Sequence, residues 1–290
     1  MCGRINACAS IDAVARASRV ERHASSSETR DVAGSRRNVS PGSSVSVVRA
    51  KTKMRSTRDE RETNASGDAR ETLTLTSMVW GVPLRARAAR GSEGGEEEGA
   101  WIPRTYNARV EGLDGDVPQF ARLAERDDRR CVVYVDGFYE WREEGPRGRA
   151  VKQPYLVRRA DGAPMALAGV FERKIDADED ETDITKEEAV IVTTSSTNGD
   201  LEWLHDRQPL VLSTDDDFDA WMFGEWRGVA ATRTAKTLAG AFAWHPVTTR
   251  MNVADYAGED ASKKVKRAVE KDAGSIASMF AAAKKRKTET

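Results

Sequence analysis

The sequence predicts an α+β fold in which short strands outnumber helices. Apolar and β-branched runs of about four to eight residues recur along the chain, whereas only two stretches have helical periodicity. The strand-like runs follow one another without a helix between each pair, which argues against a parallel sheet of alternating strands and helices. The 290 residues contain no internal repeat and suffice for one large or two small domains.

Two helices and three polar insertions are predicted around these strands. The helices lie at residues 11–20 and 215–226. We expect an extended hairpin or disordered insertion at 51–71, a loop rich in Gly and Glu at 87–100, and a solvated acidic hairpin at 175–188. Strands are predicted at residues 45–48, 73–80, 131–135, 155–158, 166–172, 189–194 and 243–247.

The composition is that of a globular protein with long polar loops. Apolar residues make up 39% of the chain and charged residues 32%, and no run approaches the roughly 20 apolar residues of a membrane span. The formal net charge of −1 is the difference between 46 basic and 47 acidic residues, which are unevenly placed. Between residues 263 and 287, nine basic residues face two acidic ones. We therefore expect any nucleic acid to bind through a local basic patch.

Cysteine and histidine content argues against disulfides and metal sites. Cys2, Cys8 and Cys131 form no framework and no CxxC pair, which is typical of a reducing compartment. With only three histidines and no ligand cluster, we expect no metal and no cofactor.

The second residue carries the most specific chemistry. A small residue after Met1 normally allows that methionine to be removed, which leaves Cys2 with a free α-amine beside its thiol. The amine condenses with an aldehyde to an imine, and the sulfur then closes a five-membered thiazolidine ring. Both groups react in their deprotonated forms. A penultimate cysteine alone is usually chemically idle, so the hypothesis depends on catalytic groups downstream.

One downstream strand carries polar residues at alternating positions. Asn107, Arg109 and Glu111 would share one face. Such a face is usually solvated, but beside a reactive terminus it offers an amide for an oxyanion and a guanidinium for a phosphate. Residues 37–42 are typical of a turn between strands.

Glu140 follows an apolar strand and stands between aromatic residues. Desolvation there would raise the pKa of its carboxyl group toward the range in which it can donate and accept protons. A salt-bridged edge glutamate is an equally good interpretation of this residue alone.

His205 stands in a turn-like segment beside Asp206 and Arg207, where it could shuttle protons. Taken in isolation, such a histidine is more often a capping or core residue.

Six short motifs in this order resemble those of the SRAP family, the SOS response-associated peptidases or abasic-site processing proteins. The motifs are Met1-Cys2-Gly3-Arg4, Asn38-Val39-Ser40-Pro41-Gly42, NARVE from Asn107, DGFYEW from Asp136, HDRQP from His205 and WHPV from Trp244. The resemblance implies a single SRAP-type domain over residues 1–257, with a mostly antiparallel, barrel-like β core and a few helices. A mostly disordered basic tail would follow at 258–290.

The resemblance also implies a site and a reaction. Met1 would be removed autocatalytically, and Cys2 would form a thiazolidine cross-link with the ring-opened abasic site in single-stranded DNA. Asn107 would orient the Cys2 end, Glu140 would act as general acid and base, and His205 would assist opening of the sugar ring. DNA contacts are implied for Arg4, Asn38, Pro41, Trp80 and Arg109.

The chain departs from the family pattern after Trp80. The usual WGLxPxW stretch is replaced by Trp80-Gly81-Val82-Pro83-Leu84-Arg85, and Trp101 is a candidate substitute for the missing aromatic residue. Gly112 stands where the family commonly has Thr, and Arg122 is displaced by one position.

The C-terminal tail predicts a nuclear location. Lys284–Lys287 form a compact basic cluster typical of a nuclear localisation signal or a DNA tether. Ile276, Met279 and Phe280 have the spacing of a sliding-clamp (PCNA) box, without its glutamine and paired aromatics, so a turn without a partner is the alternative. We expect a monomer in the nucleus, with the cytoplasm as the alternative location and no membrane association.

Two other functions remain open. A thiol peptidase or hydrolase acting on other proteins would use Cys2 as its nucleophile, supported by Glu140 and His205. A non-covalent reader of modified bases would bind DNA without using the thiol. Only the cross-linker requires a terminal cysteine, so we prefer that prediction, with its lyase-like reversal.

Overall fold

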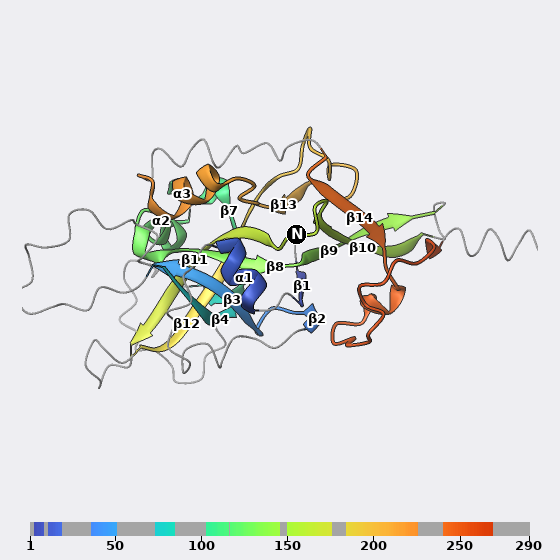
Figure 1. Cartoon of the computed structure of the whole chain (residues 1–290), viewed down its shortest axis with the longest axis horizontal. Helices are drawn as coiled ribbons and strands as arrows, with labels where there is room; N and C mark the ends of the chain where they lie inside the picture. Colours follow the sequence, from blue (N-terminus) through green and yellow to red (C-terminus); the bar gives the residue numbers. More distant parts are fainter. Residues whose placement is uncertain are drawn as a thin grey trace, which may run out of the picture.

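Five strands close into a barrel that forms one half of the molecule (Figure 1). The barrel strands are β3 (Ser44–Ala50), β4 (Leu73–Trp80), β8 (Arg130–Val135), β11 (Met165–Ile175) and β12 (Ile184–Ser195). Their order is β11-β8-β3-β4-β12, and pairing of β12 with β11 closes the ring. All neighbours are antiparallel except β12 and β4. The computed structural model describes residues 3–8, 11–18, 36–50, 73–84, 103–115, 117–145, 150–175, 184–225 and 240–268.

A second, antiparallel sheet extends from the barrel in the order β14-β10-β9-β1-β2 (Figure 1). Its strands are β1 (Arg4–Ala7), β2 (Arg36–Val39), β9 (Gly137–Glu144), β10 (Val151–Arg159) and β14 (Phe242–Pro246). The chain passes directly from barrel strand β8 into β9 through Asp136. Two short strands, β7 (Asn107–Arg109) and β13 (Arg207–Pro209), pair with barrel strand β12, and β5 (Val82–Pro83) and β6 (Arg104–Thr105) form a separate two-stranded sheet.

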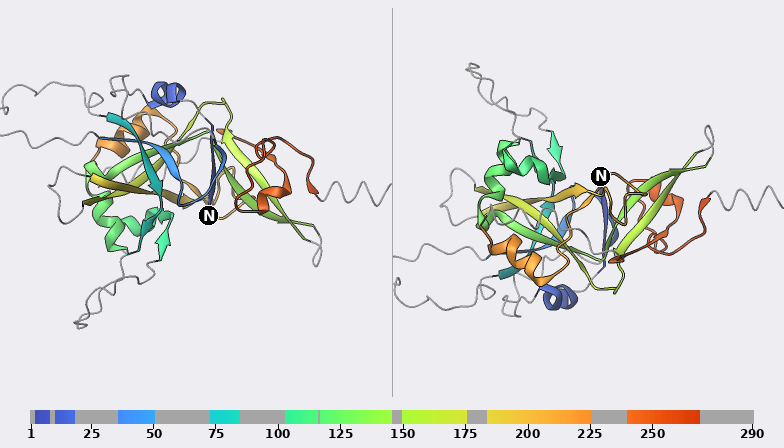
Figure 2. Two further views of the ribbon diagram at one scale, coloured as in Figure 1. Left: turned by 90° about the horizontal axis from the view of Figure 1, so that it is seen from below. Right: turned by 90° about the horizontal axis from the view of Figure 1, so that it is seen from above.

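Three helices pack on the barrel, with α1 and α2 on opposite sides of it (Figure 2). They are α1 (Ile11–Ser18), α2 (Pro118–Ala124) and α3 (Asp215–Phe223), accompanied by the 3-10 helices η2 (Val110–Asp114), η3 (Asp127–Arg129) and η4 (Thr249–Asn252). Val14, Phe120 and Trp221 bring one buried side chain from each α-helix into a common core. None of the described helices is long and apolar enough to cross a membrane.

Alternation along β8 explains how one strand serves two cores. Val132 and Tyr134 face the helices, whereas Cys131, Val133 and Val135 belong to the core shared with the second sheet. Because both faces are covered, all six residues of β8 are buried. This strand therefore holds the barrel and the second sheet together just before the chain reaches Glu140.

The predicted α+β class and antiparallel barrel-like core are confirmed. All seven predicted strands and both predicted helices are present in the described residues, with shifted ends. The sequence reasoning missed β1, β2, β9 and α2 as elements. The first two are only four residues each and contain charged residues, so their strand character comes from pairing rather than from an apolar pattern.

Glu187 and Glu188 correct the prediction that the acidic run 175–188 is solvated throughout. Both lie in β12, where Glu187 pairs with Arg173 at 2.8 Å and Glu188 with Arg104 at 2.9 Å. The side chain of Glu188 is fully buried. Cations on neighbouring segments compensate these carboxylates, which is what allows an acidic stretch to continue a buried strand.

Residues 258–268 pack on the second sheet, so the predicted domain boundary at residue 257 lies too early. Ala261 is buried, the Val265 N–H donates to the Pro246 carbonyl at 3.0 Å, and the Ala268 N–H donates to the Gln153 side chain at 2.9 Å. Several predicted features lie outside the described residues: Met1, Cys2, Trp101, the insertions 51–71 and 87–100, Ile276, Met279, Phe280 and Lys284–Lys287.

Candidate functional site

Glu140 is a buried carboxylate in the second sheet. It lies on β9 opposite Tyr155 of β10, and only 6% of its surface is exposed. Since alternate residues of a strand share a face, Glu140 lies on the side of Phe138, which packs into the core between the two sheets. The Glu140 side chain is therefore held on the face of the second sheet that packs toward this core.

Strand β1 brings the start of the chain to Glu140. β1 pairs antiparallel with β9, and Arg4 lies opposite Tyr139. The ladder ends at this pair, so along the chain Gly3 directly precedes it and Glu140 directly follows it. Cys2 lies outside the described residues and its role stays a prediction. The strand that leads to it, β1, lies beside β9, the strand that carries Glu140 (Figure 1).

Asp136 and Gly137 set the register of β1. The Asp136 carboxylate accepts a hydrogen bond from the Cys8 N–H, and the Asp136 N–H donates to the Asn6 carbonyl at 2.8 Å. A Cβ atom on Gly137 would lie 2.3 Å from the Val157 carbonyl oxygen, so β9 can approach β10 this closely only with glycine. The first two residues of the DGFYEW motif thus position the strands that surround its glutamate.

Asn107 begins β7, which runs parallel to β12. Asn107 is paired with Ile191 and Arg109 with Thr193. Ala108 between them is buried, so Asn107 and Arg109 share the opposite face, where Asn107 is partly exposed and Arg109 exposed. These two side chains are arranged as the alternating pattern predicts.

Glu111 lies in η2, which corrects the prediction that it shares the face of Asn107. Instead, Arg207 donates from Nη1 and Nη2 to its two carboxylate oxygens at 2.7 and 3.0 Å. Arg207 Nη2 also donates to the Thr193 carbonyl at 2.7 Å. The hydrogen bond from Arg207 is the main cause that lowers the pKa of Glu111 from its ordinary value. This pair fastens the segment of His205 to that of Asn107, a connection the sequence reasoning missed.

His205 lies in the turn before β13 with a partly exposed ring. Its backbone N–H donates to the Leu201 carbonyl at 3.1 Å, which shapes the turn. Ring atom Nδ1 lies 3.0 Å from the Arg207 backbone nitrogen and 2.6 Å from an Asp206 carboxylate oxygen. A neutral Nδ1 accepts from the Arg207 N–H, whereas a protonated Nδ1 donates to Asp206. Both forms of the ring therefore have a partner, which suits the predicted proton shuttle.

Strand pairing and one aromatic contact connect the segments that carry Asn107, Glu140 and His205. β7 and β13 flank β12 at the same level, both opposite Thr193. Trp203, two residues before His205, packs edge-to-face on Tyr155, with ring centroids 5.0 Å apart. Tyr155 is the pairing partner of Glu140. The segments of Asn107, Glu140 and His205 thus belong to one continuous packed unit.

Arg4 and Asn38, two predicted DNA contacts, hold the C-terminal segment. Arg4 Nη1 donates to two carbonyl oxygens within residues 251–253, at 2.5 and 3.0 Å, and its guanidinium lies 5.0 Å from the Trp141 ring centroid. Burial lowers the pKa of Arg4. Asn38 Nδ2 donates to the Tyr256 carbonyl at 2.8 Å. Both side chains have a structural role, and their DNA contacts stay predictions.

Trp80 is a core residue, which corrects the prediction that it packs at the DNA surface. Its side chain is fully buried, and its indole N–H donates to the Tyr106 carbonyl at 2.9 Å. The exposed ring here is that of Tyr106, 40% exposed, which lies over Gly81 and directly precedes Asn107. Its position directly before the NARVE motif was the available sequence signal. Pro41 is partly exposed, and its DNA contact stays a prediction.

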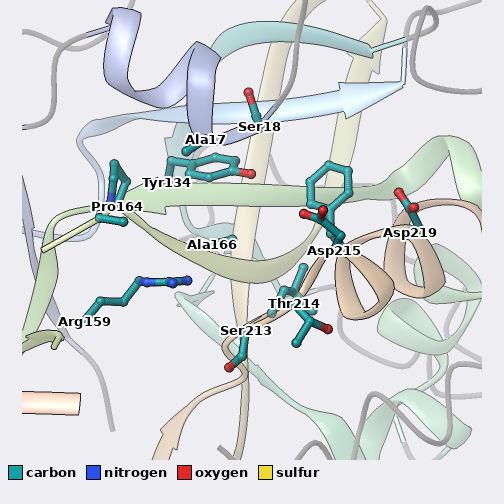
Figure 3. Close-up of a pocket in the computed structure, with 13 residues that line it drawn as sticks. Ala17, Ser18, Tyr134, Arg159, Pro164, Ala166, Ser213, Thr214, Asp215 and Asp219 are labelled. Atoms are coloured by element: carbon teal, nitrogen blue, oxygen red, sulfur yellow. The ribbon is translucent and has the colours of Figure 1, made fainter. Parts of the chain in front are cut away.

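A hollow of about 260 Å³ lies between α1, α3 and the ends of the adjoining strands (Figure 3). Asp215 and Asp219 lie on its α3 side. The first amides of α3 are capped internally, because Thr214 and Asp217 exchange side-chain and backbone hydrogen bonds. None of the candidate site residues lines this hollow. In the described part of the chain, no three His, Cys, Asp or Glu side chains converge to hold a metal ion.

A comparison with protein families identifies the chain. The model described as SOS response associated peptidase (SRAP) matches residues 1–254. The chain belongs to the SRAP family. The matched range includes all candidate site segments and ends within the C-terminal segment that Arg4 and Asn38 hold.

Curated relatives of this SRAP chain are named abasic site processing proteins. YedK of Escherichia coli (strain K12) is 33% identical over 153 residues, covering 50% of this chain and 61% of that protein. YMR114C of Saccharomyces cerevisiae is 34% identical over 122 residues, covering 41% and 28%. HMCES of Xenopus tropicalis is 30% identical over 142 residues, covering 43% and 40%. The matched region thus spans less than two thirds of each relative.

Solved structures share the SRAP fold at lower identity. A protein from Bacteroides thetaiotaomicron aligns with a TM-score of 0.61 at 18% identity, covering 91% of this chain and all of that one. A phage-related protein from Bordetella bronchiseptica aligns with a TM-score of 0.55 at 22% identity, covering 85% and 94%. These likenesses concern the fold alone.

Proposed function

We propose that this SRAP protein captures abasic sites in single-stranded DNA covalently, as a thiazolidine formed by Cys2. The observation that carries the proposal is the register of β1, which leads the start of the chain alongside the buried Glu140. The relatives' names as abasic site processing proteins suggest the substrate class. The family's description as a peptidase supports removal of Met1 by the protein itself.

Removal of Met1 comes first, because it creates the reactive amine. Water hydrolyses the peptide bond between Met1 and Cys2, releasing methionine and leaving the α-amine of Cys2 beside its thiol. The amine then adds to the C1′ aldehyde of the opened sugar to give a carbinolamine. Protonated Glu140 donates its proton to the departing hydroxyl, which leaves as water, and an imine remains.

Ring closure completes the cross-link. The Cys2 thiolate adds to the imine carbon, and the nitrogen takes up a proton. The thiazolidine thus holds both bonds to the former aldehyde carbon, and the net reaction releases one water. In the reverse direction the Glu140 carboxylate takes this proton back as water adds to the imine, so the same groups support slow release.

The other site residues act before and around this step. His205 takes the proton from the C1′ hydroxyl of the closed sugar and returns one to the ring oxygen, which opens the ring. Its two alternative partners, Asp206 and the Arg207 amide, support such a transfer. The Asn107 amide donates to the sugar oxygen, and exposed Arg109 binds a flanking phosphate.

A denaturing gel tests the proposal. Purified protein is mixed with an oligonucleotide that contains one abasic site, and we expect a heat-stable shifted band with a mass equal to the sum of both molecules less one water. Cys2→Ser keeps the amine and should give only an imine, which borohydride traps and heat removes. A form that retains Met1 should give neither product.

The alternative functions give different results. A peptidase acting on other proteins would release peptide fragments repeatedly and leave the oligonucleotide unmodified. A non-covalent reader would show tight binding that Cys2→Ala leaves unchanged and no heat-stable band. Either result would overturn the proposed capture reaction.

We further propose that the tail directs the protein to the nucleus and to a sliding clamp. Lys284–Lys287 would serve import, and Ile276, Met279 and Phe280 would contact PCNA, with the protein itself a monomer. A fluorescent fusion in which these four basic residues are replaced by alanine should lose nuclear enrichment. Pull-down by immobilised PCNA should depend on Phe280.

A further inference from the structure

A groove of aromatic and basic side chains lies at the end of the second sheet beside the proposed site. Its cavity volume is about 480 Å³. Three aromatic residues and three cations line it: Tyr155, Trp203, Trp244, Arg142, Lys264 and Arg267. Such a combination of flat rings and positive charges is the chemistry that recognises single-stranded nucleic acid.

Three aromatic rings pack in sequence from the buried Tyr155 through Trp203 to the exposed Trp244. Trp203 packs edge-to-face on Tyr155 and lies 5.7 Å from Trp244, with the two ring planes inclined by 43°. The outermost ring, Trp244, is 40% exposed, and the Arg142 guanidinium lies 5.2 Å from the Trp203 centroid. The inner rings thus hold Trp244 in place, and its exposed ring is available to a flat ligand.

The charge of the groove favours a polyanion. Arg142, Lys264 and Arg267 are exposed, whereas the acidic lining residue Glu144 is largely buried, accepts a hydrogen bond from the Tyr155 hydroxyl and lies 4.0 Å from Arg267 Nη1. The lining thus carries three cations against one carboxylate. Burial and Glu144 together raise the pKa of Tyr155, so its phenol stays neutral. The tail is an unsuitable occupant, because residues 269–290 hold five basic residues against three acidic ones.

The groove is continuous with the proposed site. Arg142 lies two residues after Glu140 on the same face of β9, Tyr155 is the pairing partner of Glu140, and Trp203 precedes His205 by two residues. Two residues of a strand span about 6.6 Å. A strand of DNA leaving the site on this side would therefore meet the groove within about one nucleotide.

We infer that this groove binds the single-stranded DNA on one flank of the captured residue, with a base against Trp244 and phosphates at Arg142, Lys264 and Arg267. This inference rests on the proposed function, since the DNA is its substrate. It assigns the groove a role in holding undamaged nucleotides, separate from the chemistry at Cys2.

Equilibrium binding to a protein that cannot cross-link tests the groove. In a Cys2→Ala background, fluorescence anisotropy is measured with labelled oligonucleotides that carry a tetrahydrofuran abasic analogue and are extended on the 5′ or the 3′ side. Trp244→Ala should weaken binding roughly tenfold, within the range for one stacked base, and only for oligonucleotides extended on one side. Trp244→Phe keeps a ring and should restore most of the affinity.

The salt dependence separates the charged contacts from the aromatic one. Arg142→Gln should reduce the slope of log affinity against log salt by about 0.7, the value for one phosphate of a single strand. Trp244→Ala should leave this slope unchanged. Arg126→Gln is the matched control, because Arg126 is an exposed cation paired with Asp128 outside the groove. Melting temperatures of all variants check that they are folded.

The outcomes distinguish this inference from the proposed function. If the groove variants bind every oligonucleotide like their parent while the heat-stable band forms normally, the inference is wrong and the capture reaction stands. If the groove variants weaken binding as expected, but the protein with Cys2 intact forms no heat-stable band with the abasic-site oligonucleotide, the capture reaction is wrong and the groove stands. The inference would also be wrong if Trp244→Ala weakened binding equally for 5′ and 3′ extensions. It would likewise be wrong if Arg126→Gln changed the slope of log affinity against log salt as much as Arg142→Gln does.

Discussion

Single residues in this chain show how far side-chain chemistry depends on surroundings. In the sequence, Glu140 follows an apolar strand and Trp80 ends one, and the family resemblance implies a functional role for each. Glu140 is buried on β9, the strand that pairs with β1 near the start of the chain, and this position supports the proposed acid–base role. Trp80 is buried in the core, where its ring and its bonded N–H contribute packing. The same degree of burial therefore supports one role and excludes the other.

Glu140→Gln tests the acid–base role at this scale. The amide keeps the size of the side chain but cannot donate or accept the proton of the departing hydroxyl. We expect the rate of heat-stable adduct formation to fall by about 10²- to 10⁴-fold, the usual contribution of a general acid or base. The measurement is single-turnover cross-linking followed on denaturing gels.

Glu143→Gln is the matched control. Glu143 is exposed on the opposite face of β9, so its replacement should leave the cross-linking rate within about twofold of the parent. Equal losses in both variants would mean that net charge, rather than a proton at Glu140, controls the rate.

At the scale of elements, the pair between Arg207 and Glu111 joins η2 to β13 and β12. Two nitrogens of Arg207 bind both carboxylate oxygens, a fork geometry that fixes direction as well as distance. Since Arg207 also binds the Thr193 carbonyl, its guanidinium joins η2 to both β12 and β13. These hydrogen bonds of Arg207 therefore help to fix the position of the turn that carries His205.

The pH dependence of stability tests this pair. Because Arg207 lowers the pKa of Glu111 in the folded state, the pair stabilises the protein above the unfolded pKa of about 4.5. That contribution is lost as the pH falls through the lower, folded value. Above about pH 5, Glu111→Gln should therefore lower the melting temperature by about 2 °C, as expected for a partly exposed pair. The difference in melting temperature between the parent and Glu111→Gln should become smaller below pH 4.5.

An Arg207→Gln background provides the control. There the main cause of the pKa shift is absent, so adding Glu111→Gln should produce no further pH-dependent change in the melting temperature. Differential scanning calorimetry between pH 3 and 7 makes the comparison. A difference that stays constant across this range in the wild-type background would contradict the role of the pair.

At the scale of the whole molecule, the C-terminal segment closes the second sheet. Residues 251–268 run beside β1 and β2, where Arg4 and Asn38 bind their carbonyl groups, and reach Gln153 on β10 (Figure 2). The beginning and the end of the described chain thus stabilise each other across the sheet that holds Glu140.

Truncation tests this closure. A chain that ends at residue 257 should melt at least about 4 °C below one that ends at residue 268. It loses the buried Ala261 and the hydrogen bonds of Val265 and Ala268, together roughly 2 kcal/mol. Circular dichroism at a fixed heating rate compares the two. Identical melting temperatures would restore residue 257 as the domain boundary.

Local patterns in the sequence were sufficient for the fold class and most elements. The apolar runs of β3, β4, β8, β11 and β12 predict strands because burial on both faces requires continuous apolar residues. The ordered motifs around Asn107, Glu140 and His205 likewise identified the family. These signals lie within a few consecutive residues, where the periodicity of side chains along a strand is informative.

Only the tertiary structure decided which of these residues meet. The register of β1 on β9 and the reach of Arg207 to Glu111 join residues about 100 or more positions apart. Two further contacts join residues that are closer in the sequence. The Trp80 indole N–H donates to the Tyr106 carbonyl, and the Trp203 ring packs beside that of Trp244. Such contacts depend on how strands pair and sheets pack, and a one-residue change of register would reverse every face involved. The local sequence is compatible with several such arrangements, and the packed core selects one.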